Sequence, residues 1–233
     1  MKDILRWLYP DRCAFCGEAV APEDNHLCAR CRSGVLPIGR NRCFVCGKPV
    51  EEGRELCADC ADHPHVFDEG RGIFVYDAKM RSSILRYKES GHRRNARAYA
   101  EAMAENAGTE LARWRPDALI PVPVHASRRK SRGFNQAECI AEELSALTGI
   151  PCINWLVEKV RPTASQKTLS AAARRQNLKQ SLRVRQRLRG GSFVVIDDVY
   201  TTGSTIDAMA ACLKEAGAQR VYFLTVCIGK QDR

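Results

Sequence analysis

The chain has 233 residues, enough to bury the cores of one or two domains, and a formal net charge of +10. It has no apolar run near the roughly 20 residues that span a bilayer, and the opening MKDILRWLYP lacks the features of a signal peptide. We therefore expect a cytoplasmic protein without a membrane span. Residues 1–62 hold nine Lys/Arg and ten Asp/Glu, whereas residues 63–233 hold 28 and 17. A polyanionic partner is thus expected to bind to residues 63–233.

Eight of the twelve cysteines form four CxxC units within the first 60 residues, separated by 11, 11 and 10 residues. In a cytosolic chain, paired cysteines indicate metal rather than disulfides, and a redox CxxC motif normally occurs once on a βαβ scaffold. Two units complete one tetrahedral four-cysteine site, so the sequence predicts two structural Zn²⁺ ions. The ligands would be Cys13, Cys16, Cys28, Cys31, Cys43, Cys46, Cys57 and Cys60.

The pairing of these units has two solutions. Sequential pairing, Cys13–Cys31 in one site and Cys43–Cys60 in the other, needs the shortest loops, and a cross-braced arrangement of alternate units stays open. His26, His63 and His65 lie near the ligands but are not needed if every cysteine is used. The four later cysteines lie in apolar surroundings and are expected to be buried free thiols. They are Cys139, Cys152, Cys212 and Cys227.

From Phe67 onward, strand and helix signals alternate, which predicts an α/β domain with a mostly parallel sheet covered on both faces. The apolar runs predict strands at Gly72–Tyr76, Asp117–Val124, Ile153–Val157, Phe193–Ile196 and Arg220–Ile228. The amphipathic segments predict helices at Met80–Tyr87, Ala96–Ala112, Phe134–Thr148 and Thr205–Ala216.

The segment FVVIDDVYTTGSTID, residues 193–207, carries the most chemical information. A buried strand is expected to end in the acids Asp197 and Asp198, and a run of small hydroxyl residues with a glycine then opens a helix. Unpaired N–H groups and hydroxyls at a helix N-terminus bind phosphate, and two acids one loop away suit the vicinal hydroxyls of a sugar. The loop residues are Thr201, Thr202, Gly203, Ser204 and Thr205. This pattern predicts a site for ribose 5-phosphate.

The same segment resembles the phosphoribosyl-pyrophosphate (PRPP) motif of type I phosphoribosyltransferases. The resemblance implies that Asp197 and Asp198 bind the ribose hydroxyls and are the catalytic acids, and that Thr201 to Thr205 cradle the 5-phosphate. It also implies Mg²⁺, which arrives on the pyrophosphate of PRPP. Where transferases of 6-oxopurines have a third acid, this chain has Thr201, which disfavours that chemistry and leaves the acceptor open.

Three further segments resemble the ComF family. They are LIPVPVHASRRKSRGFNQAE at 119–138, RPTASQKTLSAAARRQNLKQS at 161–181, and Lys88 with Gly91. The resemblance implies a double zinc-ribbon domain at 1–65 and a type I phosphoribosyltransferase fold at 66–233, with a hood or entry segment at 66–115 and a core at 116–233. It also implies a role in DNA uptake and natural transformation, with single-stranded DNA and other DNA-uptake proteins as candidate partners.

Basic residues are the expected ligands of the leaving pyrophosphate, whose charge must be stabilised as it departs. The turn after Pro123 supplies Ser127, Arg128 and Arg129, and a flap over the diphosphate would supply Lys159, Arg161, Arg174 and Arg175. The flap belongs to Lys159–Arg189, which has ten basic residues and no acid. Two functions therefore stay open: a transferase acting on an unidentified acceptor, and a non-catalytic protein that binds single-stranded nucleic acid.

Overall fold

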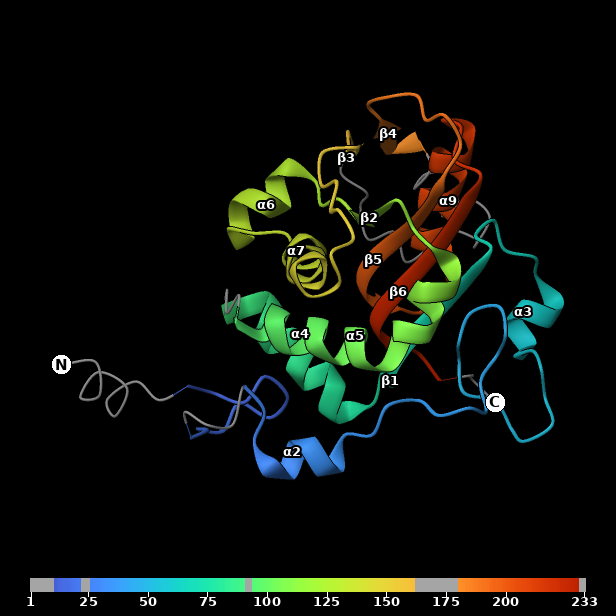
Figure 1. The fold of residues 1–233 in the computed structure, drawn as a ribbon. Helices are drawn as coiled ribbons and strands as arrows, with labels where there is room; N and C mark the ends of the chain where they lie inside the picture. The colour runs from blue at the N-terminus through green and yellow to red at the C-terminus, as the bar shows by residue number, and fades with distance from the viewer. Residues whose placement is uncertain (1–10, 22–25, 91–93, 162–179, 231–233) are drawn as a thin grey trace, which may run out of the picture.

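The computed structural model describes residues 11–21, 26–90, 94–161 and 180–230 (Figure 1). Its helices are α2 (Ala29–Gly34), α3 (Ala58–Asp62), α4 (Ala78–Ser90), α5 (Arg94–Trp114), α6 (Ala126–Arg132), α7 (Gln136–Thr148) and α9 (Ser204–Glu215). Its strands are β1 (Glu69–Val75), β2 (Ala118–Pro121), β3 (Val157–Lys159), β4 (Leu182–Val184), β5 (Ser192–Tyr200) and β6 (Arg220–Ile228). Among the described residues, no helix combines the length and the apolar character needed to cross a bilayer.

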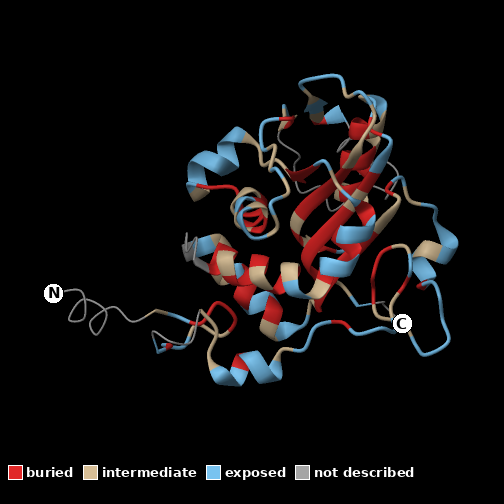
Figure 2. Cartoon of the chain, in the orientation of Figure 1, coloured by how far each residue is buried: buried red, intermediate tan, exposed pale blue. Residues whose placement is uncertain are grey.

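A parallel four-stranded sheet in the order β1-β6-β5-β2 forms the centre of the larger domain. The two inner strands, β6 and β5, are buried over most of their length (Figure 2). Helices α5 and α7 pack on the sheet with α4 alongside, and α9 packs against β5 and β6 from the other face. The expected parallel α/β architecture is confirmed.

The N-terminal region consists of two similar ribbons. Antiparallel bridges pair Arg12 with Ala19 in the first and Arg42 with Pro49 in the second. A short helix follows the third cysteine of each ribbon, since α2 starts after Cys28 and α3 after Cys57. Duplication of one structural unit is therefore visible in the backbone.

The two ribbons pack against opposite parts of the core. In the first ribbon, Phe15 contacts the rings of Phe74 and Tyr99 at centroid distances of 5.3 and 6.0 Å. In the second ribbon, Cys43, Cys46 and Cys57 are buried with the apolar residues beneath α9. The first ribbon therefore packs with α4 and α5, and the second ribbon packs with α9.

Three expected elements differ from the structure. The strand expected at 153–157 is absent except for its last residue: Cys152 forms an isolated bridge to Leu119, and β3, which starts at Val157, forms a separate antiparallel pair with β4. The turn expected after Pro123 contains the helix α6. Strand β5 continues through the acids to Tyr200, because β6 offers backbone partners as far as Ile228. The expectation of four buried thiols was wrong for Cys139 and Cys152, which are half-buried, whereas Cys212 and Cys227 are buried.

Candidate functional site

The loop between β5 and α9 leaves donor groups free at the start of the helix. Gly203 adopts the left-handed conformation with φ of 77°, and no side chain caps the N-terminus of α9, so its first N–H groups remain available. The hydroxyls of Thr202 and Ser204 lie 3.0 Å apart. A hollow of about 30 Å³ is lined by this loop from Val199 to Ile206 together with Asp197. Its size and its donors suit a single phosphate group.

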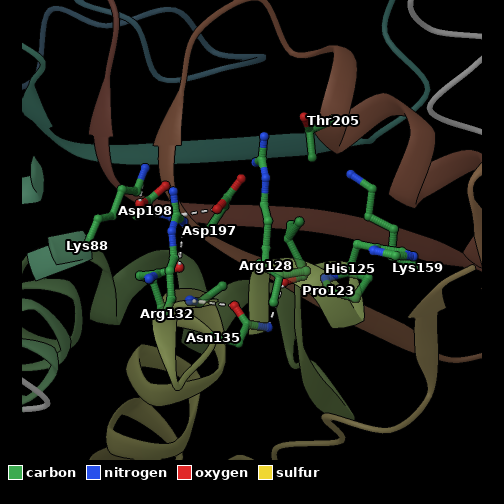
Figure 3. Close-up of a pocket in the computed structure, with 14 residues that line it drawn as sticks. Lys88, Pro123, His125, Arg128, Arg132, Asn135, Lys159, Asp197, Asp198 and Thr205 are labelled. Carbon is green, nitrogen blue, oxygen red and sulfur yellow. Dashed lines mark hydrogen bonds and ion pairs between the residues drawn. The ribbon is translucent and has the colours of Figure 1, made fainter. Parts of the chain in front are cut away.

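The two acids on β5 lie beyond the end of β2, which pairs with β5 only as far as Pro121 and Ile196. Neighbouring residues of a strand point to opposite faces, so Asp197 and Asp198 meet different surroundings. Asp198 is buried, and its Oδ2 lies 2.6 Å from Nζ of Lys88 on α4 (Figure 3). This oxygen is therefore paired with an ammonium group, and the carboxylate keeps further lone pairs that can accept a hydrogen bond from a sugar hydroxyl.

Asp197 faces the cavity and accepts a hydrogen bond at Oδ1 from the backbone N–H of Asp198 at 2.8 Å. The pKa of Asp197 is raised above its ordinary value, first because the surrounding protein excludes water and second because the Asp198 carboxylate lies beside it. Lys88 acts in the opposite direction. Two adjacent carboxylates held this way attract hydroxyl donors or a cation.

Basic side chains form the facing wall of a larger hollow of about 190 Å³ (Figure 3). Arg128 and Arg132 come from α6, and Lys159 comes from the end of β3. The pKa of Lys159 is lowered, chiefly by burial and then by the positive charge of Arg128. These cations line the same cavity as the acids, where an additional anionic group would relieve their mutual repulsion.

The two hollows adjoin each other, because Asp197 and Thr205 line both. The smaller hollow offers helix N–H groups and hydroxyls, and the larger one offers two carboxylates together with basic side chains. A ligand that carries a sugar and more than one phosphate group matches this set of chemical groups. The phosphate loop and acids expected from the sequence therefore lie together in space.

The expected pyrophosphate and flap residues are dispersed. Arg128 and Lys159 line the larger hollow, but Ser127 hydrogen-bonds His125 at 2.8 Å and Arg129 pairs with Glu138 at 3.1 Å. Arg161 is exposed at the last described position before the gap. Arg174 and Arg175 lie outside the described residues. The helical form of α6 explains the split, since successive helical residues point in different directions.

Several cavity residues were not assigned a role from the sequence. They are Lys88, His125, Arg132 and Asn135. All four belong to the segments that resemble the ComF family, so the signal was present but had no chemical interpretation. Asn135 caps α7 by accepting from Ala137 N–H, and it donates to the carbonyl of Val122 at 3.0 Å. It thereby joins the strand that ends at the cavity to the helix beside it.

The eight ribbon cysteines gather into two groups, Cys13–Cys16–Cys28–Cys31 and Cys43–Cys46–Cys57–Cys60, with all four sulfurs of a group within 4.8 Å of one another. The sulfurs of Cys16 and Cys28 are 3.7 Å apart, and those of Cys46 and Cys57 are 3.6 Å apart. A tetrahedral zinc site with Zn–S of about 2.3 Å has S–S edges of about 3.8 Å, whereas a disulfide is far shorter. The residues fit structural zinc, and sequential pairing is confirmed over the cross-braced alternative.

The second ribbon and the linker after it lie directly behind the phosphate loop. His65 Nδ1 is 2.9 Å from Oδ2 of Asp207 on α9, and the backbone N–H of Val66 donates to the other oxygen of Asp207 at 2.8 Å. A Cβ atom at Gly203 would lie 2.6 Å from the Tyr200 hydroxyl and 3.0 Å from the His65 ring. These contacts fix the position of the loop from behind, so His65 has a structural role that the sequence did not reveal.

Comparison with known proteins agrees with this architecture. A family described as "Double zinc ribbon domain" matches residues 4–61, and one described as "Phosphoribosyl transferase domain" matches residues 92–233. "DNA utilization protein YhgH" of Salmonella typhimurium is 30% identical over 228 residues, covering 94% of this chain and 97% of the relative. "Competence protein F" of Haemophilus influenzae is 29% identical, covering 90% and 93% of the two chains. "Competence protein ComFC" of Bacillus subtilis is 27% identical, covering 83% and 80%.

The chain belongs to the ComF family. As a ComF protein it combines a double zinc ribbon with a phosphoribosyltransferase domain, as the motifs in its sequence predicted. The identification accounts for the arrangement of β5, α9 and the loop between them. It leaves the ligand and the reaction of the cavity to be inferred from the residues themselves.

Proposed function

We propose that this ComF protein binds PRPP with Mg²⁺ and transfers its ribose 5-phosphate to an acceptor during the handling of incoming DNA in the cytoplasm. The observation that carries the proposal is the pair of adjoining hollows that share Asp197 and Thr205. The names of the relatives, which refer to competence and DNA utilization, support the biological setting. Residues 1–65 would form the zinc domain, 66–115 the hood and 116–233 the core of the transferase.

The 5-phosphate would occupy the hollow in front of α9. The N–H groups at the start of the helix donate to its oxygens, and the hydroxyls of Thr201, Thr202, Ser204 and Thr205 are available beside them. The positive end of the helix dipole adds to the attraction. Gly203 lets the backbone turn around the phosphate without a side chain in the way.

The ribose would lie between the phosphate loop and the cations, with its hydroxyls on Asp197 and Asp198. Lys88 holds Asp198 in place and offsets its charge. Mg²⁺ bound with the diphosphate would supply charge neutralisation, and it usually binds through one or two carboxylates and substrate phosphates. The carboxylate pair that lines this cavity fits such an ion, because Mg²⁺ takes oxygen ligands such as carboxylates.

The diphosphate would lie along Arg128, Arg132 and Lys159. When the bond from ribose C1 to the diphosphate oxygen breaks, positive charge develops on the sugar ring and negative charge on the leaving oxygen. The cations of α6 and β3 stabilise the leaving group, and the carboxylates on β5 lie on the side of the sugar. Arg161, Arg174 and Arg175, with Ser127 and Arg129, remain proposed additional contacts that would form as the flap closes.

Calorimetric titration with PRPP and Mg²⁺ tests the binding step. Asp198→Asn should weaken binding about ten- to a hundredfold, because it removes a charge-assisted hydrogen bond worth roughly 1.5 to 3 kcal/mol. Asp62→Asn, on the exposed end of α3, is the matched control and should bind as the wild type does. Unchanged affinity in Asp197→Asn and Asp198→Asn alike, with the fold intact, would mean that the acids are structural.

The transfer step needs its own measurement. Release of pyrophosphate from PRPP should be assayed with candidate acceptors, with and without single-stranded DNA. Turnover with any acceptor identifies a transferase. PRPP binding that alters DNA affinity, without turnover over the whole panel, identifies the alternative, a nucleic-acid-binding protein regulated by the sugar-phosphate site.

A further inference from the structure

A separate cavity of about 320 Å³ lies at the sheet edge formed by β1. Its walls come from the second ribbon, the start of β1 and the end of α5, and they include Arg40, Arg42, Arg71, Arg113 and Phe44. It shares no residue with the two hollows of the proposed PRPP site. Strand β6 lies between β1 and β5, so the two sites occupy different parts of the molecule.

Arg71 is the unusual residue of this cavity. Its side chain is 6% exposed, and Nη2 donates to the carbonyl of Ile38 at 2.9 Å. Its Nε and Nη1 have no hydrogen-bond partner among the described residues. A buried donor without an acceptor is costly, and a charged one more so. Arg71 therefore places a buried, incompletely paired positive charge in the wall of the cavity.

The acids nearby do not satisfy these cations. Glu110 lies 3.6 Å from Nε of Arg71, but it also pairs with Arg42 at 2.5 Å. The pKa of Arg71 is lowered by burial and then by Arg42, and Glu110 acts in the opposite direction.

The second acid, Glu69, accepts hydrogen bonds from both terminal nitrogens of Arg113, at 2.8 and 2.5 Å. Arg40 is exposed and has no ion pair among the described residues. Four arginines thus face two carboxylates, and the excess of positive charge favours an anion. Because guanidinium groups match the oxygens of a phosphate in geometry, phosphate is the anion that we expect.

Phe44 adds an aromatic surface to the same cavity. Its side chain is 64% exposed, although it is large and apolar, and it follows Cys43 in the second ribbon. An exposed ring beside basic residues is the arrangement on which nucleic-acid bases stack. The volume also lies at the lower end of the range for small-ligand sites.

We propose that this cavity binds a nucleotide, with the phosphate on Arg40 and Arg42, attracted also by the buried charge of Arg71, and the base stacked on Phe44. The shared chemistry covers a free mononucleotide and one unit of a single strand. The site is independent of the PRPP proposal, because it involves other residues.

The test uses the full chain carrying Asp197→Asn and Asp198→Asn, so that a nucleotide cannot be held by the carboxylates of the other site. Adenosine 5′-monophosphate is titrated calorimetrically into this parent and into versions with Phe44→Ala or Arg40→Gln. Phe44→Ala should weaken binding about five- to a hundredfold, because base stacking is lost. Arg40→Gln should weaken it about tenfold.

The matched controls are Leu36→Ala, another exposed apolar residue of the N-terminal region, and Arg54→Gln, a surface arginine of the same ribbon. Both should bind within about twofold of the parent, which is under 0.5 kcal/mol. A twelve-nucleotide thymidine strand is titrated in parallel. If the strand shows the same dependence on Phe44 and Arg40, the cavity holds a unit of a strand; dependence confined to the mononucleotide identifies a free nucleotide. The proposal is overturned if neither probe binds the parent, or if Phe44→Ala and Arg40→Gln bind as the controls do.

Discussion

Replacing Asp197 by asparagine should stabilise the ligand-free protein at neutral pH while it weakens ligand binding. Burial, followed by the neighbouring charge of Asp198, raises the pKa of Asp197 to about 8. An acid whose pKa is higher in the folded than in the unfolded chain holds its proton more tightly when folded. Its contribution to stability therefore falls as pH rises from about 4, where the unfolded group ionises, to about 8.

The magnitude follows from the shift and from the surroundings of the carboxylate. Each pKa unit corresponds to about 1.4 kcal/mol, so the unscreened shift would be worth roughly 6 kcal/mol. Asp197 faces an open cavity and the charge of Lys88, so screening should leave about 1 to 2 kcal/mol at pH 8. Asparagine keeps Oδ1 as the acceptor for the Asp198 N–H at 2.8 Å and removes the charge.

The assay is urea unfolding of wild type and Asp197→Asn, followed by circular dichroism at pH 5, 6, 7 and 8 without ligand. The stability difference should favour asparagine and grow with pH. Asp62→Asn, at an exposed acid on α3, is the matched control and should leave the stability close to that of the wild type. A variant less stable than wild type at pH 8, or a difference independent of pH, would refute the reasoning.

Lys88→Met should have the opposite effect on stability. At 2.6 Å and an effective dielectric of about 20, the attraction between Lys88 and Asp198 is roughly 6 kcal/mol, most of which compensates for desolvation. Losing the lysine leaves Asp198 buried without a partner, so we expect a net loss of about 2 kcal/mol at pH 7 in the same unfolding assay. Equal stability of Lys88→Met and wild type would show that the pair contributes nothing.

Three further predictions concern the zinc sites, the phosphate loop and the basic segment. Elemental analysis of the reduced chain should give two zinc ions per chain, and one ion or none in the wild type would contradict this prediction. Cys43→Ser should release one of the two ions and destabilise the second ribbon, because zinc binding at such sites supplies folding free energy of the order of 10 kcal/mol. Gly203→Ala should weaken PRPP binding at least tenfold in calorimetry, because the added Cβ would meet the Tyr200 hydroxyl at 2.6 Å, and unchanged binding would show that the loop adapts. Arg174→Ala combined with Arg175→Ala should reduce the slope of log K for single-stranded DNA binding against log salt concentration by roughly 1.4, because two phosphate contacts are lost. Arg30→Ala combined with Arg32→Ala should leave this slope unchanged. The reverse result would indicate that the strand binds to the ribbons.

The charge of the basic segment is partly compensated in a way that its sequence does not reveal. Glu158, one residue before the segment, pairs with Arg183 at 2.5 Å and with Arg185 at 2.7 Å. These two cations lower the pKa of Glu158. The antiparallel pairing of β3 and β4 brings them together, so fewer of the ten charges face a polyanion than the composition indicates.

The sequence by itself determined the features that depend on local chemistry. The spacing of the CxxC units predicted two four-sulfur sites because two thiolates three residues apart bind one metal whatever surrounds them. The order of apolar strand, acids, hydroxyls and glycine predicted the phosphate loop because a helix N-terminus presents its N–H groups by itself. Alternation of strands and helices likewise required a parallel sheet.

Tertiary structure alone decided which distant groups meet. Lys88 on α4 reaches Asp198 on β5, and His65 after the second ribbon reaches Asp207 on α9, 142 residues away in the chain. Arg71 meets Arg42 and Glu110 only because β1, α5 and a ribbon pack together. Such contacts depend on packing between elements, which periodicity and spacing do not encode, because they describe each element separately. The sequence therefore determined the parts of the site, and packing determined their counter-charges and supports.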